Sequence, residues 1–137
     1  MEQAMSQDRT LDACLDDTLH PEKAAKVLTT LLRDDQFEDL AAYFRVLGEP
    51  SRVRLLHCLL DAELCVCDLA ALSNLSVAAT SQHLRTLRNL HLVKRRREGK
   101  VMWYSLADEH IRSLLFITQE HLAHAQPRAA ARPVEVS

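Results

Sequence analysis

Two helical patterns separated by a three-residue break constrain this chain more than any other feature. Residues 64–72 and 76–90 carry apolar side chains at helical spacing, and residues 73–75 lie between them. Ser76 is a good N-cap for the second pattern, because its hydroxyl can accept a hydrogen bond from a free backbone N–H. A helix, a short turn and a second helix have the spacing of a helix-turn-helix. The segment therefore predicts a motif that reads DNA.

The outward face of residues 76–90 has the composition that a reader of the major groove needs. Small residues let the backbone approach DNA, hydroxyls donate to phosphates or bases, and Gln and Arg can bond base edges bidentately. The residues expected to face inward are Val77, Leu84, Leu87 and Leu90. The predicted DNA contacts are Ser76, Ala78, Thr80, Ser81, Gln82, His83 and Arg85. An ordinary solvated helix face is the alternative for this segment alone.

A basic hairpin follows the second helix directly. Residues 92–106 predict two short strands around a turn at Glu98 and Gly99, with Trp103 and Tyr104 on the return strand. A basic hairpin in this position is typical of a wing, which contacts the DNA backbone or minor groove beside the recognition helix. The cations expected to contact DNA there are Arg95, Arg96, Arg97 and Lys100.

Composition and charge limit the class of protein. The chain has 137 residues, 47% of them apolar, with only two Gly, which favours one mostly helical domain. Its net charge of −2 hides an uneven distribution of charge. Residues 51–105 contain nine basic and four acidic side chains, which gives this segment a net charge of +5. No long apolar run or leader is present, so we expect a cytoplasmic protein without membrane contact and with reduced thiols. No nucleophile–base pairing or phosphate-binding Gly loop occurs, so we expect no enzyme.

The chain divides into three predicted regions. Residues 1–20 form a flexible acidic arm that carries Cys14 and His20, and residues 126–137 form a disordered tail. Residues 21–125 form a mainly α winged helix-turn-helix and dimerisation domain of about five to six helices plus a two-stranded β wing. Further helices are expected at about 35–47, 50–61 and 108–125. In residues 50–61 we expect Val53, Leu56, Leu59 and Leu60 to face inward, with Cys58 as a buried structural thiol.

Two thiols and a carboxylate precede the helix-turn-helix. Cys65, Cys67 and Asp68 lie within four residues, and soft ligands beside a DNA-binding pattern suggest a metal sensor. Residues i and i+2 of a regular helix point about 200° apart. Both thiolates can reach one ion only if Cys65 lies at a non-helical start. We therefore expect the helix to begin at or just after Cys65.

The last helix carries three histidines beside its apolar stripe. His110, His121 and His124 fall within about 60° of one another at about 100° per residue. His110 and His121 are nevertheless roughly 16 Å apart along the axis. Two such helices, antiparallel about a two-fold axis, could combine Asp108 and His110 with the partner's His121 and His124. This donor set suits tetrahedral Zn(II). Surface histidines on a dimer helix are the alternative.

Several segments together resemble the ArsR/SmtB family of winged-helix metal-sensing repressors. They are residues 47–56, 63–70, 81–87, 92–93 and 98–101, followed by Tyr104, and the resemblance covers roughly residues 35–125. It implies a homodimer that binds a palindromic operator when metal-free and is released when metal binds.

The resemblance also implies two kinds of metal centre. Cys65 and Cys67 match a thiol-rich centre, with Cys14 of the partner's arm as the third thiolate and His20 or Asp68 as the fourth ligand. Asp108, His110 and His121 match a second centre, where His124 stands in place of the Glu of many zinc sensors. Thiolates favour Cd(II), Pb(II), Cu(I), As(III) and Zn(II), whereas imidazole and carboxylate favour Zn(II).

Two rival functions remain open from the sequence. A winged-helix regulator could sense redox state through Cys65 and Cys67, in which case thiol oxidation would release DNA and metal would not. A metal-buffering protein would need no operator, but that reading leaves the basic wing unexplained.

Overall fold

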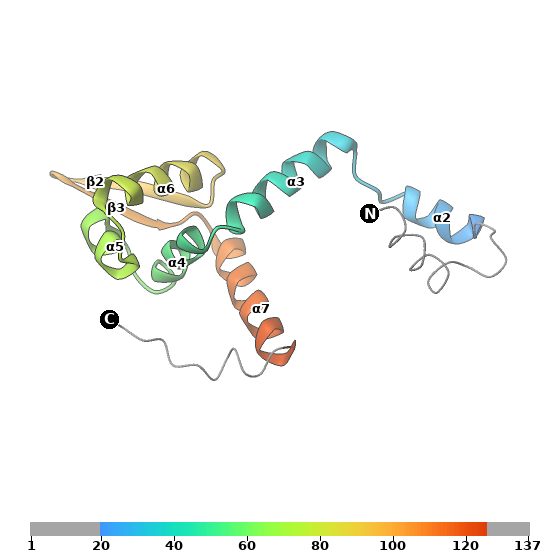
Figure 1. The fold of residues 1–137 in the computed structure, drawn as a ribbon. Coiled ribbons are helices and arrows are strands. Elements are labelled where there is room, and N and C mark those ends of the chain that lie inside the picture. Colours follow the sequence, from blue (N-terminus) through green and yellow to red (C-terminus); the bar gives the residue numbers. More distant parts are fainter. Residues whose placement is uncertain (1–19, 126–137) are drawn as a thin grey trace, which may run out of the picture. The chain divides into compact units, whose positions relative to one another are not determined.

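The computed structural model describes residues 20–125, which form six helices and a three-stranded sheet (Figure 1). The helices are α2 (Pro21–Leu28), α3 (Asp34–Leu47), α4 (Pro50–Cys58), α5 (Val66–Ser73), α6 (Val77–Asn89) and α7 (Glu109–Ala125). The strands are β1 (Leu64–Cys65), β2 (Val93–Glu98) and β3 (Val101–Leu106). The predicted mainly α fold with a β wing is confirmed. Most of the predicted arm and the whole predicted tail lie outside the described residues.

The chain divides into two compact units, Met1–Glu38 and Asp39–Ser137. In the first unit, α2 begins with Pro21 at a position where its missing N–H costs no hydrogen bond. None of the residues of α2 is buried. The second unit contains the core, the helix-turn-helix and the wing.

The core is built from one face of each helix from α4 to α7 and from the base of the wing. Its buried members are Leu55, Leu56, Leu59, Leu69, Leu84, Leu87, Leu92, Val93, Tyr104, Leu106, Ile111 and Leu115. The expectation that Val53 faces inward is wrong, because Leu55 is fully buried and Val53 is exposed. Leu55, Leu56 and Leu59 span an arc of about 100° on α4, and Val53 lies more than about 100° from its middle.

The wing is an antiparallel hairpin whose register runs from Val93 opposite Leu106 to Glu98 opposite Val101. Gly99 at its tip has a positive φ of 62°, a conformation that other residues adopt only with strain. A third strand, β1, pairs with β3 and completes the order β1-β3-β2. The sequence did not predict β1, because two residues are too few to show strand periodicity.

Candidate nucleic-acid interface and metal-ligand positions

The turn between α5 and α6 has the local structure that the sequence predicts. Asn74 ends α5 in the left-handed conformation, with φ of 55° and ψ of 44°, which Asn tolerates better than most residues. The Ser76 hydroxyl accepts a hydrogen bond from the backbone N–H of Ala79 at 3.0 Å and so caps α6. Because α5 packs against α6 around Leu69 and Leu84, the two helices form one rigid motif.

The free face of α6 retains most of the predicted DNA-contact residues. Ser76, Ala78, Ser81, Gln82 and Arg85 are exposed, and His83 is half-buried. These six residues therefore form a polar surface of small, amide and basic side chains on the second helix of the motif.

Two expectations about α6 are wrong. Thr80 was expected on the outward face but is fully buried, and its hydroxyl donates to the Ser76 carbonyl at 2.8 Å. The helical period explains this, since residues 80, 84 and 87 follow i, i+4, i+7 spacing and share one face. Val77 was expected inward but is 51% exposed.

His83 is held by a residue from another helix. Nε of Arg52 on α4 donates to Nδ1 of His83 at 3.3 Å. Arg52 also donates from its backbone N–H to the Glu49 carboxylate at 3.0 Å and from Nη1 to the Val46 carbonyl at 3.4 Å. Sequence reasoning missed Arg52, because a contact between residues 31 positions apart leaves no periodic signal.

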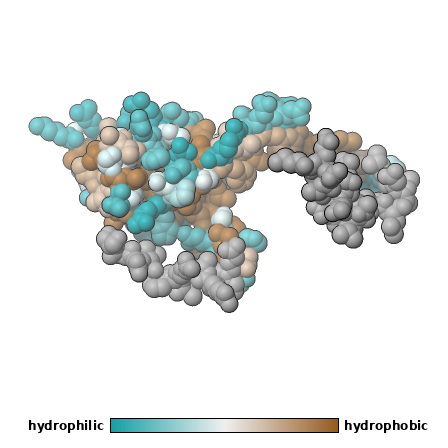
Figure 2. Space-filling view, in the orientation of Figure 1, coloured by the Kyte–Doolittle hydropathy of each residue, from teal (hydrophilic) through white to brown (hydrophobic). Residues whose placement is uncertain are grey.

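The cations of the wing are exposed but differ in whether they form ion pairs. Arg95, Arg97 and Lys100 are exposed, and hydrophilic side chains cover the projecting hairpin (Figure 2). Arg96 pairs instead with Glu63 at 2.9 Å and with Glu98 at 2.8 Å. The hydrogen bonds that Arg96 donates to Glu63 and, with a smaller effect, to Glu98 raise the pKa of Arg96 above its usual range. The two carboxylates thus neutralise part of the positive charge that the sequence predicts to contact DNA.

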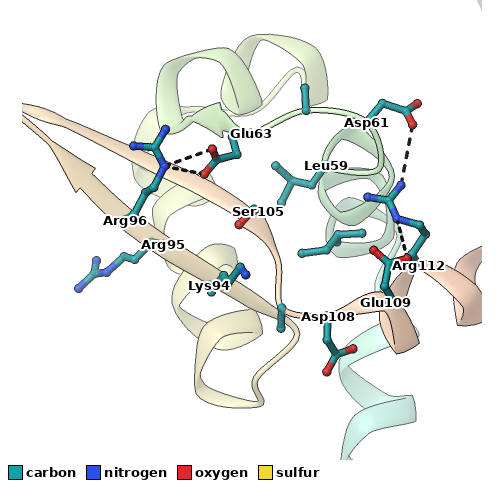
Figure 3. Close-up of a pocket in the computed structure, with 13 residues that line it drawn as sticks. Leu59, Asp61, Glu63, Lys94, Arg95, Arg96, Ser105, Asp108, Glu109 and Arg112 are labelled. Carbon is teal, nitrogen blue, oxygen red and sulfur yellow. Dashed lines mark hydrogen bonds and ion pairs between the residues drawn. The ribbon is translucent and has the colours of Figure 1, made fainter.

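A cleft of about 710 Å³ lies between the wing base, the loop after α4 and the start of α7 (Figure 3). Arg96 and Glu63 pair on one side of it, while Arg112 pairs with Glu109 at 3.4 Å and lies 3.8 Å from Asp61 on the other. These pairs connect the loop between α4 and β1 to both the wing and α7. Paired charges therefore line two sides of the cleft.

Cys65 lies at the start of α5, as the sequence predicts. Its backbone is extended, with φ of −85° and ψ of 169°, and α5 begins at the next residue. Its Sγ donates a hydrogen bond to Oδ2 of Asp68 at 3.2 Å. Cys65 is half-buried and Cys67 is exposed. Cys58 packs against the core and is only partly buried.

The other two predicted thiol-centre ligands, Cys14 and His20, belong to the first unit of the chain. Cys14 lies outside the described residues. His20 is exposed and directly precedes α2 in the first unit.

The start of α7 contains the next candidate ligands. One oxygen of Asp108 accepts hydrogen bonds from the backbone N–H groups of His110 at 2.9 Å and Ile111 at 3.3 Å. His110, His121 and His124 are all exposed. Within residues 20–125 of a single chain, no three His, Cys, Asp or Glu side chains are grouped closely enough to hold a metal ion.

The exposed polar face of α6 and the basic hairpin beside it define a winged helix-turn-helix DNA-binding protein. Residues 49–95 match the family model described as bacterial regulatory protein, arsR family. The chain is 40% identical to the transcriptional repressor SmtB homolog of Synechocystis, with 85% of this chain and 88% of that protein covered. The chain belongs to the ArsR/SmtB family.

Further comparisons agree with this membership. The chain is 38% identical to a cadmium resistance transcriptional regulatory protein, the CadC homolog of Staphylococcus aureus, covering 83% of this chain and 97% of that one. A homodimeric winged helix-turn-helix domain of a possible ArsR-family regulator from Mycobacterium bovis superposes with a TM-score of 0.62. That domain is 27% identical, and 68% of this chain and 93% of the domain are covered. These relatives support metal-sensing transcriptional repression. Among the described helices, none has the length and apolar character needed to cross a membrane.

Proposed function

We propose that this protein is a homodimeric repressor that binds a palindromic operator when metal-free and is released by Zn(II) or by softer ions such as Cd(II), Cu(I), Pb(II) and As(III). The observation that carries the proposal is the position of Cys65. It ends β1, which pairs with the wing strand β3, and it is the N-cap residue of α5, which packs against α6. A change at this one residue can therefore reach both DNA-contacting elements.

The DNA-binding surface is assigned to two groups of side chains. On α6 the proposed contacts are Ser76, Ala78, Ser81, Gln82, His83 and Arg85, which are exposed or half-buried. On the wing they are Arg95, Arg96, Arg97 and Lys100. The wing cations neutralise phosphates and provide salt-dependent affinity, whereas Gln82 and Arg85 can discriminate base edges.

The thiol centre would be formed by Cys65 and Cys67, with Cys14 from a partner chain and either His20 or Asp68 as the fourth ligand. The donor set fits a soft or borderline ion, which such thiolates bind tightly. Binding requires the Cys65 thiol to lose its proton, and therefore removes the hydrogen bond that this thiol donates to Asp68. Asp68 is then free to act as a ligand or to turn towards solvent.

The second centre would combine Asp108 and His110 with His121 and His124 of the partner subunit. The exposed apolar residues of α7 support helix pairing between two chains. Phe116 is 64% exposed and Ile117 is 62% exposed. Paired α7 helices would bury these side chains and bring the histidines of two chains to the same interface.

The expected effect of metal is a 10²- to 10³-fold loss of operator affinity, which corresponds to about 3–4 kcal/mol of coupling. The metal must bind the DNA-incompetent form more tightly, because a metal with equal affinity for both forms does not change the equilibrium between them.

The test is an anisotropy titration of a labelled operator, selected from random duplexes with the metal-free protein. Metal-free protein is compared with protein loaded with Zn(II), Cd(II) or Cu(I) under strict reduction. Cys65→Ser and His121→Ala remove one candidate centre each, and Cys58→Ser is the matched control. Unchanged affinity with every metal rejects the sensor, and release by oxidant alone assigns redox sensing.

A further inference from the structure

Arg52 connects three segments of the second unit. Its Nη1 reaches the Val46 carbonyl in the last turn of α3, its backbone N–H is held by Glu49, and its Nε reaches His83 on α6. Both Arg52 and His83 are half-buried, so their contact is partly shielded from water. One side chain therefore links the end of α3 to the recognition helix.

The direction of the hydrogen bond fixes the chemistry of the imidazole. Arg52 can only donate, so Nδ1 of His83 must be the acceptor and carries no hydrogen. A neutral imidazole with a bare Nδ1 carries its hydrogen on Nε2. No partner of Nε2 occurs within residues 20–125, and His83 lies between the exposed residues Gln82 and Arg85 on α6.

We propose that Arg52 is a positioning residue for operator binding, which holds His83 in the Nε2–H tautomer and so presents this N–H to a DNA phosphate. The inference rests on the proposed function, since it needs α6 to lie against an operator. A phosphate is the expected acceptor, because side chains at the edge of a recognition helix most often fix the register of the protein on the DNA backbone. If Arg52 had only a structural role, it would stabilise α4, and the tautomer of His83 would not affect operator binding.

Two substitutions of His83 separate the contributions of the two ring nitrogens. In His83→Asn the amide oxygen can occupy the place of Nδ1 and accept from Arg52, but nothing replaces Nε2–H. In His83→Gln the longer amide reaches the place of Nε2 and can still donate outward, but the acceptor facing Arg52 is lost. Arg54→Gln is the matched control for Arg52→Gln. Arg54 lies on the same helix and donates from Nε to the Leu72 carbonyl at 3.0 Å, away from His83.

The first measurement needs no DNA. Long-range ¹H–¹⁵N NMR of histidine-labelled, metal-free protein reports the tautomer of each imidazole, and His83→Asn identifies the His83 signals by difference. We expect a single Nε2–H tautomer for His83 in the wild type and in Arg54→Gln, and a mixture of tautomers in Arg52→Gln. A Nδ1–H or mixed tautomer in the wild type would overturn the proposal.

The second measurement is operator affinity, with urea unfolding as a check on stability. We expect His83→Asn and Arg52→Gln each to lower affinity about tenfold, His83→Gln to lower it less than His83→Asn, and Arg54→Gln to have no effect. The double variant Arg52→Gln/His83→Asn should bind no more weakly than either single variant, because both changes remove one contact. Additive losses of affinity in the double variant reject the positioning role of Arg52 but do not contradict the proposed repressor function. A wild type that binds no operator rejects the proposed function as well.

Discussion

Cys65 lies opposite Trp103 in the antiparallel pairing of β1 and β3. Trp103 in turn lies opposite Arg96 of β2, and Arg96 is paired with Glu63 just before β1. The first thiol of the candidate centre and the wing therefore belong to one sheet. A displacement of Cys65 towards a metal would strain this sheet at Trp103, next to the cations expected on DNA.

The fluorescence of Trp103 should report metal binding by the thiols. Trp103 is the only tryptophan of the chain, so Cd(II) added to reduced protein should change its emission at one equivalent per centre. Cys65→Ser should weaken Cd(II) binding at least about 100-fold, since even loss of a group behind a ligand costs about 10–100-fold. Cys58→Ser should respond like the wild type. An equal response from Cys65→Ser would show that the thiol centre lies elsewhere.

Thr80 should be replaceable without loss of operator binding. Thr80→Val keeps the buried shape and removes only the hydroxyl, and the Ser76 carbonyl still accepts from the Thr80 backbone N–H at 3.0 Å. We expect a stability loss of about 0.5–1.5 kcal/mol in urea unfolding and an unchanged operator affinity. Ser81→Ala, on the exposed face, is the contrasting variant and should weaken binding. A large affinity loss in Thr80→Val alone would place Thr80 on the DNA side.

The wing arginines should differ in their contribution to salt dependence. Arg95 is exposed and makes no ion pair within residues 20–125, so Arg95→Ala should lower the slope of log affinity against log salt by about one. Arg96→Ala should lower it less, because Glu63 and Glu98 already neutralise that guanidinium. Operator titrations at several salt concentrations measure both slopes. Equal slopes for the two variants would mean that DNA displaces the carboxylates from Arg96.

Glu49 should give stability an acid-dependent component. Partial burial raises its pKa, but the backbone N–H groups of Arg52 and Ser51, with smaller contributions from His83 and Arg52, lower it below the ordinary value of 4.5. A lowered pKa in the folded state stabilises the fold fully above 4.5, and this contribution is lost as the pH falls through the lower folded value.

Glu49→Gln should therefore unfold at less urea than the wild type at pH 7, and the two midpoints should converge below about pH 4.5. Glu38→Gln is the control, because Glu38 is exposed on α3. A difference between Glu49→Gln and wild type that persists unchanged at acid pH would show that the charge of Glu49 is not the cause.

Local chemistry determined much of this protein from its sequence. The Ser76 cap and the hairpin turn at Gly99 depend on hydrogen bonds and dihedral angles within four residues. Helical periodicity likewise revealed the apolar stripes of α6 and α7. Such features leave their signal in neighbouring residues, so the winged helix-turn-helix could be predicted.

Only the tertiary structure decided which residues of those elements face the core and which residues they contact. The burial of Leu55 in place of Val53 depends on how α4 is rotated against the core, and a few tens of degrees change which side chain is covered. Arg52 with His83 and Glu63 with Arg96 are joined across 31 and 33 positions. Contacts so far apart arise from packing, which no periodicity in the sequence records.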